Sequence, residues 1–103
     1  MKMKGNKISP TYFIIFQRAH DDYLGKIEES EEVIQYAWHP DPANALKFET
    51  FDKAQKIAYQ IVSNKAHNYR LEICELHETE QQLGVLPVAI VMPHAASHKP
   101  ESN

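Results

Sequence analysis

Residues 38–64 read WHPDPANALKFETFDKAQKIAYQIVSN, and this stretch decides the fold. After Thr50, which is a suitable N-cap because its hydroxyl can accept a hydrogen bond from a first-turn amide, the pattern becomes helical. Asn64 can adopt the left-handed conformation that commonly ends a helix. Apolar residues between them recur at helical spacing and form one stripe: Phe51, Ala54, Ile57, Ala58, Ile61 and Val62. The pattern predicts an amphipathic helix over residues 51–63 that packs on one face of a sheet.

Three segments before this helix have the alternating pattern of strands. Residues 11–18 carry apolar side chains on both faces, which favours a central strand that is covered by the helix on one side and by a partner subunit on the other. Residues 23–27 and 33–38 follow, and Gly25 indicates a β-bulge or a close approach of another backbone.

The segment between the third strand and the helix is irregular. Asp41 followed by Pro42 is typical of the start of a short helical turn, because proline suits the first helical position. We expect Trp38, Ala45 and Phe48 to pack beneath the helix and to fix its angle on the sheet.

Two more extended segments follow the helix. Residues 69–77 alternate and are expected to return beside the first strand, whereas Pro87 makes residues 85–92 an edge strand or an extended cover. The predicted fold class is therefore α+β: a small antiparallel sheet in β-β-β-α-β order, with one amphipathic helix packed on one face and a C-terminal edge segment.

The length of 103 residues fits one domain. We expect residues 1–10 to be a flexible basic arm, residues 11–92 to form the single α+β domain and residues 93–103 to be a polar tail. The apolar run TYFIIF is too short for a signal-peptide core or a membrane span, and a lone cysteine fits a reducing compartment, so the sequence predicts a cytoplasmic protein.

Enzymatic chemistry has little support in the sequence. Cys74 lies in the middle of a predicted strand, where a lone cysteine is more often a small buried apolar residue than a nucleophile. Cys74 and His77 form at most half of a structural zinc site, which usually needs four ligands. Three glycines are too few for a phosphate-binding loop. We therefore expect no catalytic residues, no metal site and no cofactor, with a metal-dependent hydrolase as the least favoured alternative.

Binding to another macromolecule is the favoured class of function. An acidic run at Glu28, Glu29, Glu31 and Glu32 is most simply a solvated turn, but it could also dock a basic partner. A sheet with one helix leaves one face partly uncovered, and exposed apolar surface of that size usually meets a partner or a second copy of the chain. The predicted partner-binding residues are these four glutamates with Tyr12 and Tyr36, and a homodimer through the uncovered face is the second possibility.

Nucleic-acid binding is the alternative from a different class. Aromatic side chains on an open sheet could stack on bases if basic residues flanked them. The basic residues available for this are Lys2, Lys4, Lys7, Arg18 and Arg70. A net charge of -3 and the acidic run make this interpretation the weaker one.

The central block resembles a pattern found in small uncharacterised proteins of bacteriophages and prophages. Its pieces are Trp38-His-Pro-Asp41, Ala45-Leu-Lys-Phe48 and Ala54-Gln-Lys-Ile-Ala58, and the similarity covers roughly residues 12–76. The resemblance implies a small non-enzymatic accessory protein that blocks a bacterial defence complex, in the manner of an anti-CRISPR protein, inside the bacterial host cell. It assigns no functional residues.

Overall fold

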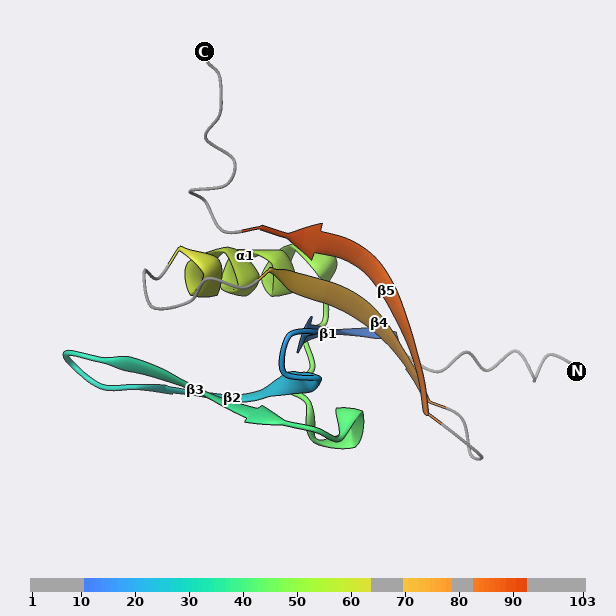
Figure 1. Cartoon of the computed structure of the whole chain (residues 1–103), viewed down its shortest axis with the longest axis horizontal. Helices are drawn as coiled ribbons and strands as arrows, with labels where there is room; N and C mark the ends of the chain where they lie inside the picture. The colour runs from blue at the N-terminus through green and yellow to red at the C-terminus, as the bar shows by residue number, and fades with distance from the viewer. Residues whose placement is uncertain (1–10, 64–69, 79–82, 93–103) are drawn as a thin grey trace, which may run out of the picture.

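The computed structural model describes residues 11–63, 70–78 and 83–92, and these form one antiparallel sheet with one α-helix (Figure 1). The elements are β1 (Tyr12–Gln17), β2 (Asp22–Glu29), β3 (Ile34–His39), the 3-10 turn η2 (Pro42–Asn44), α1 (Phe51–Val62), β4 (Leu71–Glu78) and β5 (Leu83–Val91). The strand order is β3-β2-β1-β4-β5. This confirms the predicted α+β class, the central position of the first strand and the return of β4 beside it. The predicted arm, the predicted tail and Asn64 lie outside the described residues.

Both helical segments begin at the predicted caps. The Thr50 hydroxyl accepts a hydrogen bond from the Lys53 amide at 3.2 Å, and the Asp41 carboxylate accepts one from the Ala43 amide at 2.9 Å. Each cap satisfies an amide that has no partner within the helix. The main helix ends at Val62, and Ser63 is its C-cap.

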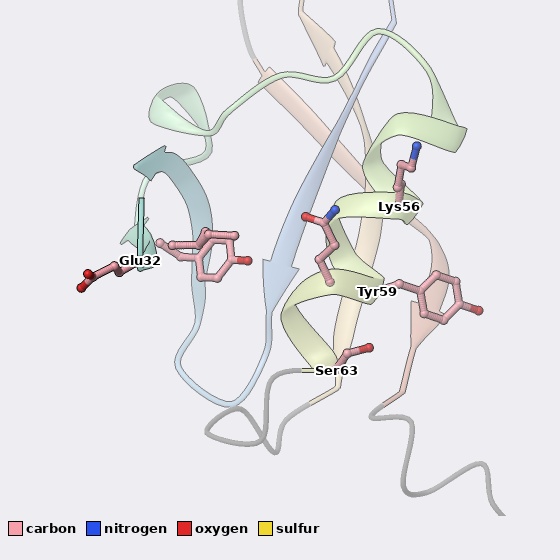
Figure 2. A pocket seen from close by; sticks show the side chains of 7 residues that line it. Glu32, Lys56, Tyr59 and Ser63 are labelled. Carbon is pink, nitrogen blue, oxygen red and sulfur yellow. The ribbon is translucent and has the colours of Figure 1, made fainter. Parts of the chain in front are cut away.

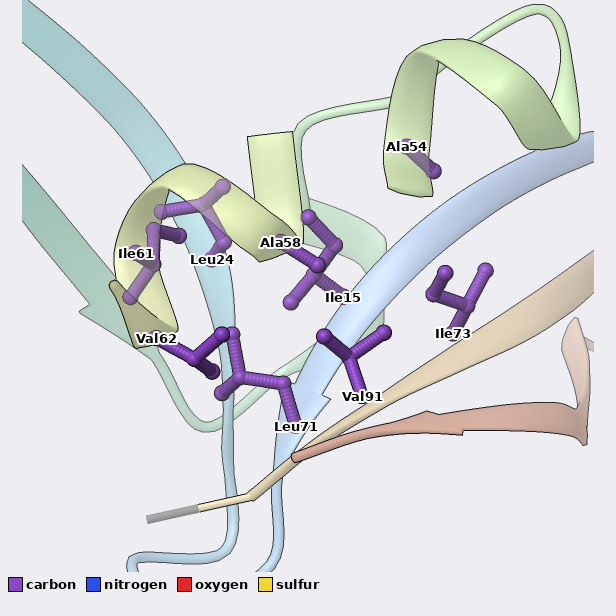
Figure 3. Packing of buried hydrophobic residues seen from close by; sticks show 9 residues of the cluster. All are labelled: Ile15, Leu24, Ala54, Ala58, Ile61, Val62, Leu71, Ile73 and Val91. Carbon is purple, nitrogen blue, oxygen red and sulfur yellow. The ribbon is translucent and has the colours of Figure 1, made fainter. Parts of the chain in front are cut away.

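The face of α1 that carries the apolar stripe packs chiefly on β1, β4 and β5 (Figure 1). Figure 3 shows the resulting core cluster, whose buried members are Ile15, Leu24, Ala54, Ala58, Ile61, Val62, Leu71, Ile73 and Val91. Two alanines at helical spacing let the helix approach the sheet closely, while the branched side chains fill the space around them. The predicted stripe is therefore the face that holds the helix on the sheet.

The opposite face of the sheet is also buried at its centre, and the expectation of an uncovered face there is wrong. Ile14, Phe16, Cys74 and Leu76 are between 0% and 7% exposed. They cluster with Ala45, which follows η2, and η2 contacts both β2 and β5. The sheet curves, most visibly along β4 and β5 (Figure 1). β2 and β5, which flank the central strands β1 and β4, therefore both come within reach of η2. Trp38 and Phe48 pack against the helix-side cluster as expected, but Ala45 belongs to this second cluster.

The hairpin of β2 and β3 separates from β1 soon after it begins. The pairing of β1 with β2 covers Phe16 with Tyr23 and Gln17 with Asp22. Beyond that point the segment between η2 and α1 lies beside β1 in place of β2. Its residue Phe48 exchanges two 2.8 Å backbone hydrogen bonds with Phe13. The far half of the hairpin therefore projects from the sheet, as Figure 1 shows for the end where β2 meets β3.

Gly25 marks the point of separation. A register shift lies between Leu24 and Lys26, which confirms the predicted bulge. A Cβ at residue 25 would lie 3.0 Å from His39 Cδ2 and 3.2 Å from the Asn44 carbonyl oxygen, so the glycine also allows the close approach of the segment after η2. The Leu46 amide donates to the Leu24 carbonyl at 2.8 Å, which holds this segment in place.

Candidate functional site

An open groove of about 780 Å³ lies between β3 and α1. Its lining residues are Glu32, Ile34, Tyr36, Lys56, Tyr59, Gln60 and Ser63. Figure 2 shows Glu32 on the hairpin side and Lys56, Tyr59 and Ser63 on the helix, with the carboxylate of Glu32 directed away from α1. The groove exists because α1 lies over β1, β4 and β5 and leaves the helix-side face of the projecting hairpin only partly covered.

The hairpin contributes an apolar surface to this groove. Ile34 is 46% exposed, whereas Ile27, Tyr36 and Trp38 on the same face are half-buried against the helix-side core. Partial burial raises the pKa of the Tyr36 hydroxyl, and the negative charge of Glu29 raises it further. The Tyr36 phenol is therefore a neutral hydrogen-bonding group beside a carboxylate.

The helix side of the groove was missed by sequence reasoning. Lys56, Gln60 and Ser63 lie away from the apolar stripe, and by periodicity alone they belong to a solvated face. Tyr59 is the one signal that could have shown otherwise, because it is a large aromatic residue outside the stripe and is 53% exposed. Its ring extends away from the hairpin in Figure 2, so it lies at the outer rim.

The tip of the hairpin carries negative charge that the described residues do not neutralise fully. Lys26 pairs with Glu28 at 3.0 Å on the exposed surface. No ion pair joins Glu29, Glu31 or Glu32 to another residue within residues 11–63, 70–78 and 83–92. The turn itself is ordered by the Ser30 amide, which donates to the Val33 carbonyl at 2.8 Å. The acidic turn is therefore a fixed structure with charges available to a partner.

The structure brings together some of the predicted partner-binding residues and separates others. Glu32 and Tyr36 both line the groove. Glu28 and Glu29 line a smaller hollow on the same hairpin, and Glu31 is exposed at the turn. Tyr12 lies elsewhere, on β1 opposite Leu76, where it packs against the second core cluster. The hairpin and the groove thus form one candidate site, and Tyr12 is not part of it.

Cys74 is 1% exposed, and burial followed by the charge of Glu72 raises the pKa of its thiol to about 11. The thiol therefore stays protonated near neutral pH, which is unsuited to a nucleophile. The Nε2 atom of His77 lies 2.9 Å from a carboxylate oxygen of Glu75, which accepts the hydrogen bond that the imidazole ring donates. Among the described residues, no three His, Cys, Asp or Glu side chains gather closely enough to hold a metal ion.

Glu72 is a buried carboxylate that is 4% exposed. Its two oxygens accept hydrogen bonds from the Arg18 guanidinium, and the bond from Arg18 Nη2 is 2.8 Å long. The hydrogen bond from Arg18 lowers the pKa of Glu72 below its ordinary value of 4.5, although burial acts in the opposite direction. Arg18 also lies 5.0 Å from the ring centroid of Phe16. The pair fixes the turn after β1 onto β4.

This pair predicts a stability change at acid pH. A carboxyl whose pKa is lower in the folded state stabilises the fold above its unfolded-state pKa, and the contribution is lost as the pH falls through the folded-state value. The difference in urea midpoint between the wild type and Glu72→Gln is expected to be constant from pH 6 to 8 and to shrink toward pH 3. A difference that stays constant down to pH 3 would contradict this assignment.

Within the described residues, no helix is long and apolar enough to cross a lipid bilayer. The chain matches no family model, no curated protein and no solved structure.

Proposed function

We propose that this chain is a non-enzymatic protein-binding module that acts by occluding a surface of its partner. The observation that carries the proposal is the projecting β2–β3 hairpin, which has an apolar groove on one side and an unneutralised acidic tip. Exposed apolar surface that is rimmed by polar and charged residues usually marks a site of protein–protein interaction. A basic protein surface has the chemistry that fits both features.

The setting we propose is the one that the resemblance to phage and prophage accessory proteins implies. A small protein of this kind would block a bacterial defence complex by covering a basic surface that the complex needs for its own substrate. The acidic hairpin supports this mode, because a negatively charged projection competes for the cationic surface that a nucleic acid would occupy.

Nucleic-acid binding by this chain has less support. Phe16 is buried, and Tyr12 and Tyr23 pack against the second core cluster, so these aromatics do not form an open stacking surface. Arg18, which lies over the Phe16 ring, is already paired with Glu72, and Lys26 is paired with Glu28. Lys2, Lys4 and Lys7 lie outside the described residues.

Site-specific photo-crosslinking tests the protein-binding proposal. A benzophenone amino acid placed at Tyr36, inside the groove, is expected to crosslink one protein reproducibly in bacterial cells. The same probe at Tyr12, a tyrosine on the other face of the sheet, is the matched control and is expected to give no such product. Equal crosslinking from both positions, none from Tyr36, or a nuclease-sensitive product would overturn the proposal.

A further inference from the structure

We infer that the outer edge of β3 binds an extended, basic segment of the partner protein as an additional β-strand, an inference that rests on the proposed protein-binding function. Sheet order places β3 at one edge, so none of the described strands pairs with the outer backbone groups of Ile34 and Tyr36. Unpaired edge groups are a template for strand addition.

The register of the hairpin identifies which backbone groups are available. The Ser30 amide bonds to the Val33 carbonyl, and in an antiparallel ladder hydrogen-bonded pairs alternate with non-bonded ones. Gln35 opposite Glu28 is therefore the next bonded pair, whereas Ile34 and Tyr36 direct their amide and carbonyl groups outward. These are the two β3 residues that also line the groove, so one strand could use the backbone edge and the groove together.

The hairpin itself would gain from such a partner. Beyond the bulge at Gly25 it is a two-stranded ribbon whose far half is no longer paired to β1. A two-stranded ribbon is marginally stable by itself, and a third strand makes it considerably more stable. The exposed side chain of Ile34 would also be covered by a neighbouring strand.

Charge selects the partner. Glu29, Glu31 and Glu32 make no ion pair among the described residues, so they would attract the lysine and arginine side chains of a strand bound beside them. The other edge strand, β5, exposes Leu86, Val88 and Ile90 but contains Pro87 and a register shift, two features that interrupt strand pairing. The regular edge of β3 is thus the better template, and a basic segment is the better occupant.

The test selects binders to the full chain from a display library of random twelve-residue peptides and measures the best one by fluorescence anisotropy. We expect the selected peptides to be rich in lysine and arginine that alternate with apolar residues. Ile34→Pro removes the outward amide but no bond to β2, and it is expected to weaken binding at least about tenfold more than Ile34→Ala, which removes only the side chain.

A second measurement does not depend on the folding of these variants. Methylating single backbone amides of the selected peptide is expected to weaken its binding to the wild type at alternate positions only, because every second amide faces β3. Recovery of no binder, of neutral or helical binders, uniform tolerance of methylation, or equal effects of Ile34→Pro and Ile34→Ala would each overturn the inference. If crosslinking from Tyr36 still captures a protein in such a case, the protein-binding proposal stands without strand addition. If the crosslinking and the peptide experiments both fail, neither the protein-binding proposal nor the strand-addition inference stands.

Discussion

Replacing Ile14 by alanine is expected to lower the free energy of unfolding by about 2 to 5 kcal/mol, as much as replacing its neighbour Ile15. The two side chains point to opposite faces of β1, and both are 0% exposed. Each substitution removes three methyl or methylene groups from a packed environment and leaves a cavity. If one face of the sheet were open to water, the substitution on that face would cost far less.

Urea unfolding of the two single variants and of the double variant measures this. Ile14→Val and Ile15→Val are the conservative controls and are expected to cost about 0.5 to 1.5 kcal/mol each. A value for Ile14→Ala close to that of an exposed site would show that the second cluster, which contains both Ile14 and Ala45, does not form in solution.

Reversing the charge of Glu29, Glu31 and Glu32 to lysine is expected to weaken partner binding by about 100-fold. Each reversal replaces an attraction to a basic surface by a repulsion, and about 1 kcal/mol per site gives about 3 kcal/mol in total. The loss is expected to shrink as the salt concentration rises, because exposed charges are screened. These side chains are exposed and make no ion pair among the described residues, so the melting temperature is expected to change little.

The matched control changes Glu49, Glu75 and Glu78 to lysine. Both triple variants change the net charge by six, from -3 to +3 (-3 + 6 = +3), but the control residues lie away from the hairpin. Binding by the crosslinked partner, measured by surface plasmon resonance, is expected to fall much less for the control. An equal loss in both variants would mean that the total charge of the chain matters and the hairpin does not.

Most of the local structure could be predicted from the sequence because it depends on neighbouring residues. The cap at Thr50, the helical stripe, the short turn after Asp41 and the bulge at Gly25 each follow from the conformational preferences of a few side chains. The assignment of Ile14 and Ile15 to opposite faces follows in the same way from the alternation of a strand.

The closure of the sheet and the position of the groove could not be predicted in that way. Ala45 and Ile14 belong to one cluster although they are 31 positions apart in the sequence, and that meeting depends on the arrangement of the whole sheet. Tyr12 and Tyr36 have similar alternating surroundings in the sequence, yet one lies on a central strand and the other on an edge strand. Lys56 and Gln60 became part of the site because the hairpin turns away from β1, and no local pattern near the helix encodes that separation.

The strand order has a consequence for the chain as it leaves the ribosome. β1 emerges early, but one of its two neighbours is β4, whose pairing joins Tyr12 to Leu76 across most of the sequence. Until β4 has been synthesised, the edge of β1 that pairs with β4 stays open and the apolar residues of β1 have no complete core. During that time, strands of neighbouring chains can pair wrongly with this edge. The first three strands and the helix can therefore be synthesised in full before β4 is available to complete the native sheet.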